Sequence, residues 1–183
     1  MMKKFMWIEN NIFHEDMQDI AKASYIPWKK LQDKTILITG ATGLIGFNLV
    51  SALAYVALYK DIALKIIALV RDEEQAKNRF HEILTAGAPL RFLVGDLNHI
   101  PPIEEKIDYI IHGGSPTASR YFAEHPVETI MTNLNGATNL LELAWKNQSE
   151  GFLFLSSMEV YGGIHCREKI NEQHASFVDT MVS

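Results

Sequence analysis

One stretch decides the fold: Thr39-Gly40-Ala41-Thr42-Gly43-Leu44-Ile45-Gly46. The run Thr35–Thr39 that leads into it is short and β-branched, which is typical of a strand buried on both faces. The apolar run Leu44–Tyr59 that follows predicts a helix. Three spaced glycines between a buried strand and a helix favour a dinucleotide-binding turn over a merely flexible one. We therefore expect a domain that binds NAD or NADP.

Each glycine has its own predicted role. Gly40 permits the tight turn, Gly43 lets the backbone approach a pyrophosphate, and Gly46 lets the helix and the strand pack closely. The N-terminus of the helix presents free N–H groups to the anion. The predicted cofactor contacts in this stretch are Gly40, Thr42, Gly43, Leu44, Ile45 and Gly46.

The alternation of strands and helices continues along the chain. Further strands are predicted at Ile66–Val70, Leu90–Val94, Asp108–His112 and Phe152–Leu155, and further helices at Glu73–Leu84 and from Pro126 onward. Five strands alternating with helices predict an α/β fold, a Rossmann-type doubly wound parallel sheet with helices on both faces. One face of the last helix, spaced by three and four residues, is expected to pack on the sheet: Val127, Ile130, Met131, Leu134, Ala137, Leu141 and Ala144.

Residues 1–33 differ from the rest, because they are polar and aromatic-rich and lack strand alternation. Ile12, Met17, Ile20 and Ala21 are loosely spaced as one helix face before Pro27. We expect an N-terminal helical extension over residues 1–33 and an NAD(P)-binding Rossmann domain over residues 34–183.

Composition excludes several classes of protein. The 183 residues are 48% apolar, and their net charge of -5 comes from mixed acidic and basic residues, so no nucleic-acid partner is expected. Cys166 is the only cysteine, which rules out an intramolecular disulfide and a Cys-based zinc site; no metal is expected. No apolar run predicts a signal peptide or a membrane span, and a cytoplasmic location is expected.

The stretch Thr39–Gly46 resembles the fingerprint of the extended short-chain dehydrogenase/reductase family, the nucleotide-sugar epimerases, dehydratases and decarboxylases. The resemblance covers about residues 35–163 and implies an NAD(P)-dependent enzyme that transiently oxidises a hydroxyl of a nucleotide-diphospho-sugar. Further segments agree in order: Gly95-Asp96-Leu97, Asp108–His112, Pro126–Ala137 and Ser156–Gly162.

The resemblance also assigns cofactor contacts outside the glycine stretch. Asp96, with Leu97 beside it, would bind the adenine, although Asp96 also fits an ordinary turn. Asn133 would hold the backbone near the active site, although it also fits a solvated helix position. The nicotinamide side of the cleft would be lined by His112, Gly113, Gly114 and Ser115.

Arg71 bears on the choice between NAD and NADP. It stands at the end of the second predicted strand, where an acid binds the ribose of NAD and a cation accommodates the extra phosphate of NADP. The sequence therefore favours NADP. Because Asp72 follows immediately, a shift of one residue would reverse this prediction.

The substrate side rests on the same resemblance. Ser157 matches the catalytic Ser or Thr, and Glu159 matches a glutamate that dehydratases and decarboxylases use near the sugar. Met158 stands where 4,6-dehydratases would have an aspartic acid, which weakens that interpretation. The loop residues Ser115, Pro116 and Ser119 resemble the sugar-nucleotide loop of UDP-glucuronate decarboxylases, although the loop also fits a plain polar turn and Ser157 a capping serine.

Members of the family use a Tyr with a Lys four residues later as their central acid and base. The sequence has no such pair after the fifth predicted strand, since the residue four positions after Tyr161 is His165. We expect the chain as written to bind a cofactor without completing catalysis, and its sheet to be incomplete at the C-terminal side. An exposed sheet edge would favour association, for example as a homodimer. A non-catalytic NAD(P)-binding module and an NADP-dependent reductase of a small carbonyl compound remain alternatives.

Overall fold

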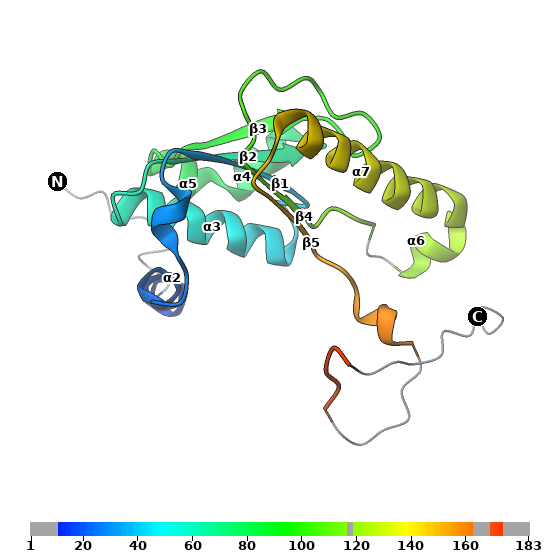
Figure 1. Cartoon of the computed structure of the whole chain (residues 1–183), viewed down its shortest axis with the longest axis horizontal. Coiled ribbons are helices and arrows are strands. Elements are labelled where there is room, and N and C mark those ends of the chain that lie inside the picture. Colours follow the sequence, from blue (N-terminus) through cyan, green and yellow to red (C-terminus); the bar gives the residue numbers. More distant parts are fainter. Residues whose placement is uncertain (1–10, 117–118, 163–168, 174–183) are drawn as a thin grey trace. The chain divides into compact units, whose positions relative to one another are not determined.

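A computed structural model describes residues 11–116, 119–162 and 169–173 (Figure 1). The chain divides into two compact units, with the boundary between Leu153 and Phe154. The strands are β1 (Lys34–Thr39), β2 (Leu64–Val70), β3 (Leu90–Val94), β4 (Tyr109–His112) and β5 (Gly151–Phe154). The helices are α2 (Asn11–Lys22), α3 (Leu44–Tyr59), α4 (Glu73–Arg79), α5 (His81–Thr85), α6 (Ser119–Glu124), α7 (Pro126–Asn147) and the 3-10 turns η1 (Trp28–Leu31) and η2 (Met158–Tyr161).

The five strands form one sheet in the order β3-β2-β1-β4-β5. β1 pairs in parallel with both β2 and β4, so that Ile38 lies opposite Ala68 on one side and Ile111 on the other. This order matches the first five positions of the doubly wound order 3-2-1-4-5-6, in which ligands bind where the order reverses. The predicted Rossmann-type parallel sheet is confirmed, and its reversal point lies between β1 and β4.

Helices cover both faces of the sheet, as predicted (Figure 1). Successive strand side chains point to opposite faces. Ile36 and Ile38 of β1 pack in the core that contains α3, whereas Leu37 packs in a second core with Leu140 of α7. β1 is therefore buried on both faces, which explains its continuous apolar sequence.

The helix predicted in the N-terminal extension is present as α2. Met17 and Ala21 are buried in the same core as α3, and the ring of Phe13 stacks on that of Phe47 with centroids 6.1 Å apart. Ile12, expected on the same face, is 73% exposed. Because α2 covers α3 on the side away from the sheet, α3 is apolar around most of its circumference.

Two predictions about the other helices are wrong. The helix expected over Glu73–Leu84 is broken at Phe80, which is fully buried with its ring centroid 5.4 Å from that of Phe47.

The apolar face predicted to pack α7 on the sheet is mostly exposed, and the buried residues of α7 are Gly136 and Leu140. Gly136 lets α7 approach the Leu97 side chain so closely that an added Cβ would lie 2.9 Å from it. Hydrophobic periodicity cannot reveal a packing face built around a glycine. The exposed members are Val127, Ile130, Met131, Leu134 and Leu141.

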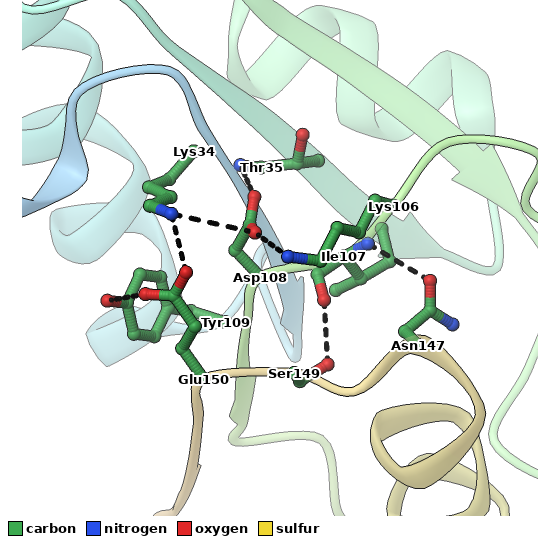
Figure 2. A network of polar contacts seen from close by, with 9 residues as sticks. All are labelled: Lys34, Thr35, Lys106, Ile107, Asp108, Tyr109, Asn147, Ser149 and Glu150. Atoms are coloured by element: carbon green, nitrogen blue, oxygen red, sulfur yellow. Dashed lines mark hydrogen bonds and ion pairs between the residues drawn. The ribbon is translucent and has the colours of Figure 1, made fainter.

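A charged network joins the amino ends of β1 and β4 (Figure 2). The buried Asp108 accepts the N–H of Thr35 at 2.9 Å and pairs with Lys106 Nζ at 2.9 Å. Lys34 pairs with Glu150, which follows α7. We call this network the amino edge; its other members are Tyr109, which donates to Glu150, and the hydrogen-bonded residues Ile107, Asn147 and Ser149.

Candidate functional site

The turn between β1 and α3 is held by close contacts between backbones. We call Gly40–Gly46 the glycine turn. Gly40 has a φ of +68°, and a Cβ there would collide with the carbonyl of Gly113 in the loop after β4. A Cβ on Gly46 would collide with the Gly40 carbonyl, so this glycine lets α3 begin against the end of β1. The loops after β1 and β4 are thus packed together at the reversal point of the sheet.

Gly43 differs from Gly40 and Gly46, because among the described residues a Cβ added there would closely approach just the Gly40 carbonyl oxygen, at 3.2 Å. Its φ of -74° suits any residue. Gly43 is also the N-cap of α3, and none of the described side chains caps that helix end. Leu44 and Ile45 in the first turn are 79% and 60% exposed. No described side chain therefore occupies the first N–H groups of α3, where an anion stays a prediction.

A threonine and a histidine connect the loops after β1 and β4. Thr39 Oγ1 lies 2.8 Å from His112 Nδ1, and Gly114 N–H donates to the same hydroxyl oxygen at 3.0 Å. Burial lowers the pKa of His112 below its ordinary value of 6.5, which favours the neutral ring. The Thr39 hydroxyl can then donate to Nδ1, which places the ring proton on Nε2. His112 is only 2% exposed, so its ring is buried and contacts Thr39 within the protein rather than at an open surface.

Ser115, in the loop after β4, and Asn133, in α7, are two predicted site residues that lie in contact. Ser115 Oγ donates to Asn133 Oδ1 of α7 at 2.9 Å. Both residues are exposed. Pro116 follows Ser115, and Ser119 begins α6. The predicted substrate loop thus leaves β4 beside α7.

Asp96 forms a turn after β3. Its carboxylate accepts the N–H groups of Asn98 at 2.7 Å and His99 at 3.0 Å. The turn interpretation of Asp96 is confirmed, and its contact with adenine stays a prediction. Leu97 packs against Gly136 of α7, and the Asn139 side chain donates to the Leu97 carbonyl at 2.8 Å.

A cavity of about 310 Å³ opens at the carboxyl end of β2. Arg71 is the first residue after β2, and Asp72 is the N-cap of α4. The Asp72 carboxylate accepts the N–H of Gln75 at 2.9 Å. The lining residues are Thr42, Val70, Arg71, Asp72 and Gln75. Thr42 and Arg71 are predicted cofactor contacts and stay predictions, whereas the sequence did not single out Gln75, whose one signal is its place three residues after the cap.

The predicted catalytic residues belong to the second unit. Ser157 precedes η2, and its carbonyl accepts the N–H of Val160 at 3.3 Å. Glu159 lies within η2. Whether these residues meet the glycine turn stays a prediction.

A model of the NAD dependent epimerase/dehydratase family matches residues 36–178. The chain belongs to this family. A UDP-glucose 4-epimerase of Rickettsia canadensis (strain McKiel) is 32% identical over 132 residues, which cover 68% of this chain and 37% of the relative. The UDP-glucose 4-epimerase of Rickettsia bellii (strain OSU 85-389) has the same identity and coverage. The chain thus spans 37% of the length of these epimerase/dehydratase relatives.

Solved structures share the fold of this epimerase/dehydratase domain. DesIV, a dTDP-glucose 4,6-dehydratase of Streptomyces venezuelae with NAD and TYD bound, gives a TM-score of 0.61 at 22% identity over 79% of this chain and 45% of that one. A Bifidobacterium longum UDP-glucose 4-epimerase in complex with NAD+ and UDP gives 0.59 at 20% identity over 79% and 43%. No helix in the described part of the chain has the length and apolar content needed to cross a membrane.

Proposed function

We propose that the carboxyl edge of the sheet, formed by the loops after β1, β2 and β4, binds NAD or NADP for chemistry on a nucleotide-diphospho-sugar. One observation carries this proposal: the glycine turn lies at the reversal point of the sheet, with the N-terminus of α3 uncapped by any described side chain. Helix N–H groups and closely packed glycines at this place form the pyrophosphate site of doubly wound folds.

The residues fit a dinucleotide because Gly43 has no side chain and the first turn of α3 has no negative charge. Gly43 lacks the Cβ that would lie between the backbone and a pyrophosphate, and the first turn of α3 carries no acidic side chain that would repel one. The Thr39–His112 pair holds the loop after β4 against the turn. When bound, the nicotinamide would accept and return a hydride, which makes transient oxidation of a sugar hydroxyl possible.

A nucleotide-sugar substrate is supported by the names of the relatives, a UDP-glucose 4-epimerase and a dTDP-glucose 4,6-dehydratase. In this proposal Ser115 of the loop after β4 and Asn133 of α7 contact the sugar nucleotide or the nicotinamide, and Ser157 and Glu159 act on the sugar. Ser157 would hydrogen-bond the hydroxyl that is oxidised. Epimerisation, dehydration and decarboxylation all begin with this oxidation.

The test of the cofactor site is Gly43→Val. A side chain there should keep a pyrophosphate away from the backbone, and we expect the affinity for NAD and NADP, measured by calorimetry, to fall at least about tenfold. Gly87→Asn is the control. Gly87 lies in the left-handed turn before β3, at the amino ends of the strands and away from the glycine turn, and Asn tolerates its conformation. Unchanged affinity in a Gly43→Val protein that is folded by circular dichroism would refute the proposed site.

The test of the reaction class gives the full-length gene product UDP-glucose, dTDP-glucose or UDP-glucuronate with either dinucleotide, because the 183 residues alone are not expected to complete catalysis. We expect a nucleotide sugar to produce reduced nicotinamide or a changed sugar, detected by absorbance and mass spectrometry. Dinucleotide binding without any turnover would instead favour a non-catalytic NAD(P)-binding module.

A further inference from the structure

We propose that the cavity at the end of β2 takes the 2′-phosphate of NADP, and that Arg71 selects NADP over NAD. This inference rests on the proposed function, because it assumes that a dinucleotide binds at the glycine turn. It adds a choice between two cofactors that the family membership leaves open.

The position of Arg71 is the first argument. In doubly wound folds, the residue at the end of the second strand faces the adenosine ribose of the bound dinucleotide. β2 ends at Val70, so Arg71 is the first residue after the strand and holds this position. Thr42 belongs to both the glycine turn and the cavity wall, so the cavity adjoins the proposed pyrophosphate site.

The state of Asp72 is the second argument. NAD-specific sites use a carboxylate at this place to accept hydrogen bonds from the ribose hydroxyls. Among the described residues, Asp72 is the one acidic residue in the cavity wall, and its carboxylate accepts the N–H of Gln75 in the α4 cap. Of the next two acidic residues, Glu73 pairs with Lys77 at 2.6 Å and Glu74 is outside the wall.

The remaining polar groups of the wall suit an anion. The Arg71 guanidinium offers a fork of donors that matches a phosphate, while the Thr42 hydroxyl and the Gln75 side-chain amide can donate as well. In a cavity of about 310 Å³, a 2′-phosphate would meet one cation, two neutral donors and one carboxylate, that of Asp72, which already accepts the Gln75 N–H.

The experiment measures the affinity of the 183-residue chain for NAD and NADP by calorimetry, in the parent, Arg71→Gln and Asp72→Asn. We expect the parent to bind NADP at least about tenfold more tightly than NAD, because charge-assisted hydrogen bonds to the phosphate contribute that much. Arg71→Gln should weaken NADP binding about ten- to a hundredfold and change NAD binding less than about threefold. Asp72→Asn keeps a capping oxygen but removes the negative charge from the wall, so it should increase the preference for NADP.

The probes 2′,5′-ADP and 5′-AMP repeat the comparison without nicotinamide and should show the same dependence on Arg71. Tighter binding of NAD than NADP by the parent, or an equal loss for both dinucleotides in Arg71→Gln, would overturn this inference and leave the proposed function standing. Failure of the parent to bind either dinucleotide would overturn the proposed function itself.

Discussion

The two ends of β1 and β4 are built in opposite ways. At the amino edge, Thr35 and Asp108 are joined through a buried carboxylate, with Lys34 and Lys106 beside it. At the carboxyl edge, the same two strands end in Thr39 and His112 and continue into glycines, and the loops meet backbone to backbone. One edge joins the strands through paired charges, and the other brings main-chain groups together with little side-chain bulk.

This difference suits the amino edge to stabilising the fold and the carboxyl edge to binding a ligand. Polar groups at the amino edge are largely engaged with one another, which leaves them little capacity to bind a ligand. At the carboxyl edge no described side chain caps the first N–H groups of α3, so these groups can donate hydrogen bonds to a ligand. Changes at the two edges should therefore have distinguishable consequences.

The largest effect is expected from Gly46→Val at the carboxyl edge. The new side chain would collide with the backbone of Gly40 and Ala41, which cannot move without separating α3 from β1. We expect a loss of about 3 kcal/mol or more in the free energy of unfolding, measured by urea denaturation. Gly43→Val, three residues away, is the matched control and should lose much less. Equal stability of the two variants would contradict the packing role of Gly46.

The next effect is expected from Asp108→Ala at the amino edge. The change leaves the Thr35 N–H without its partner and removes the anion beside Lys106, at an expected cost of about 2–3 kcal/mol. Asp108→Asn, which keeps an acceptor for Thr35, should cost less. Dinucleotide affinity of the folded variants should equal that of the parent; a clear loss would show that the two edges are coupled.

The comparison also shows what the sequence could predict. The carboxyl edge was largely predictable, because the glycine turn is continuous in sequence and strand ends in a parallel sheet meet at one edge. The amino edge was not, since the Lys34–Glu150 pair joins residues that are 116 positions apart and leaves no local pattern. The role of Thr39 was missed for a related reason: its hydroxyl acts through His112 and Gly114, 73 and 75 residues later. Periodicity predicted β1, β3 and α3 well, but it assigned the wrong face of α7, where a glycine makes the contact.

A smaller effect is expected from Thr39→Val, which keeps the shape of the side chain and removes its hydroxyl. Gly114 N–H and His112 Nδ1 would both lose a partner, at a cost of about 1–2 kcal/mol. Because the loops after β1 and β4 would be held less firmly, dinucleotide affinity should also fall. Thr39→Ser should restore both properties, and an unchanged affinity in Thr39→Val would limit this threonine to a role in stability.

The smallest effect is a difference between the two edges in their response to acid. Burial lowers the pKa of His112 below 6.5, so the unfolded chain takes up this proton first and stability should fall as the pH drops below about 6.5. Burial raises the pKa of Asp108, but the Thr35 N–H and Lys106 lower it more, to a value below its ordinary 3.8. The stability that Asp108 contributes is therefore present above about pH 3.8 and is lost as the pH falls below it. Urea denaturation over a series of pH values should show a slope between about pH 7 and 5 that His112→Asn removes and Asp108→Asn retains. The same slope in His112→Asn as in the parent would mean that the carboxyl edge does not depend on a neutral His112.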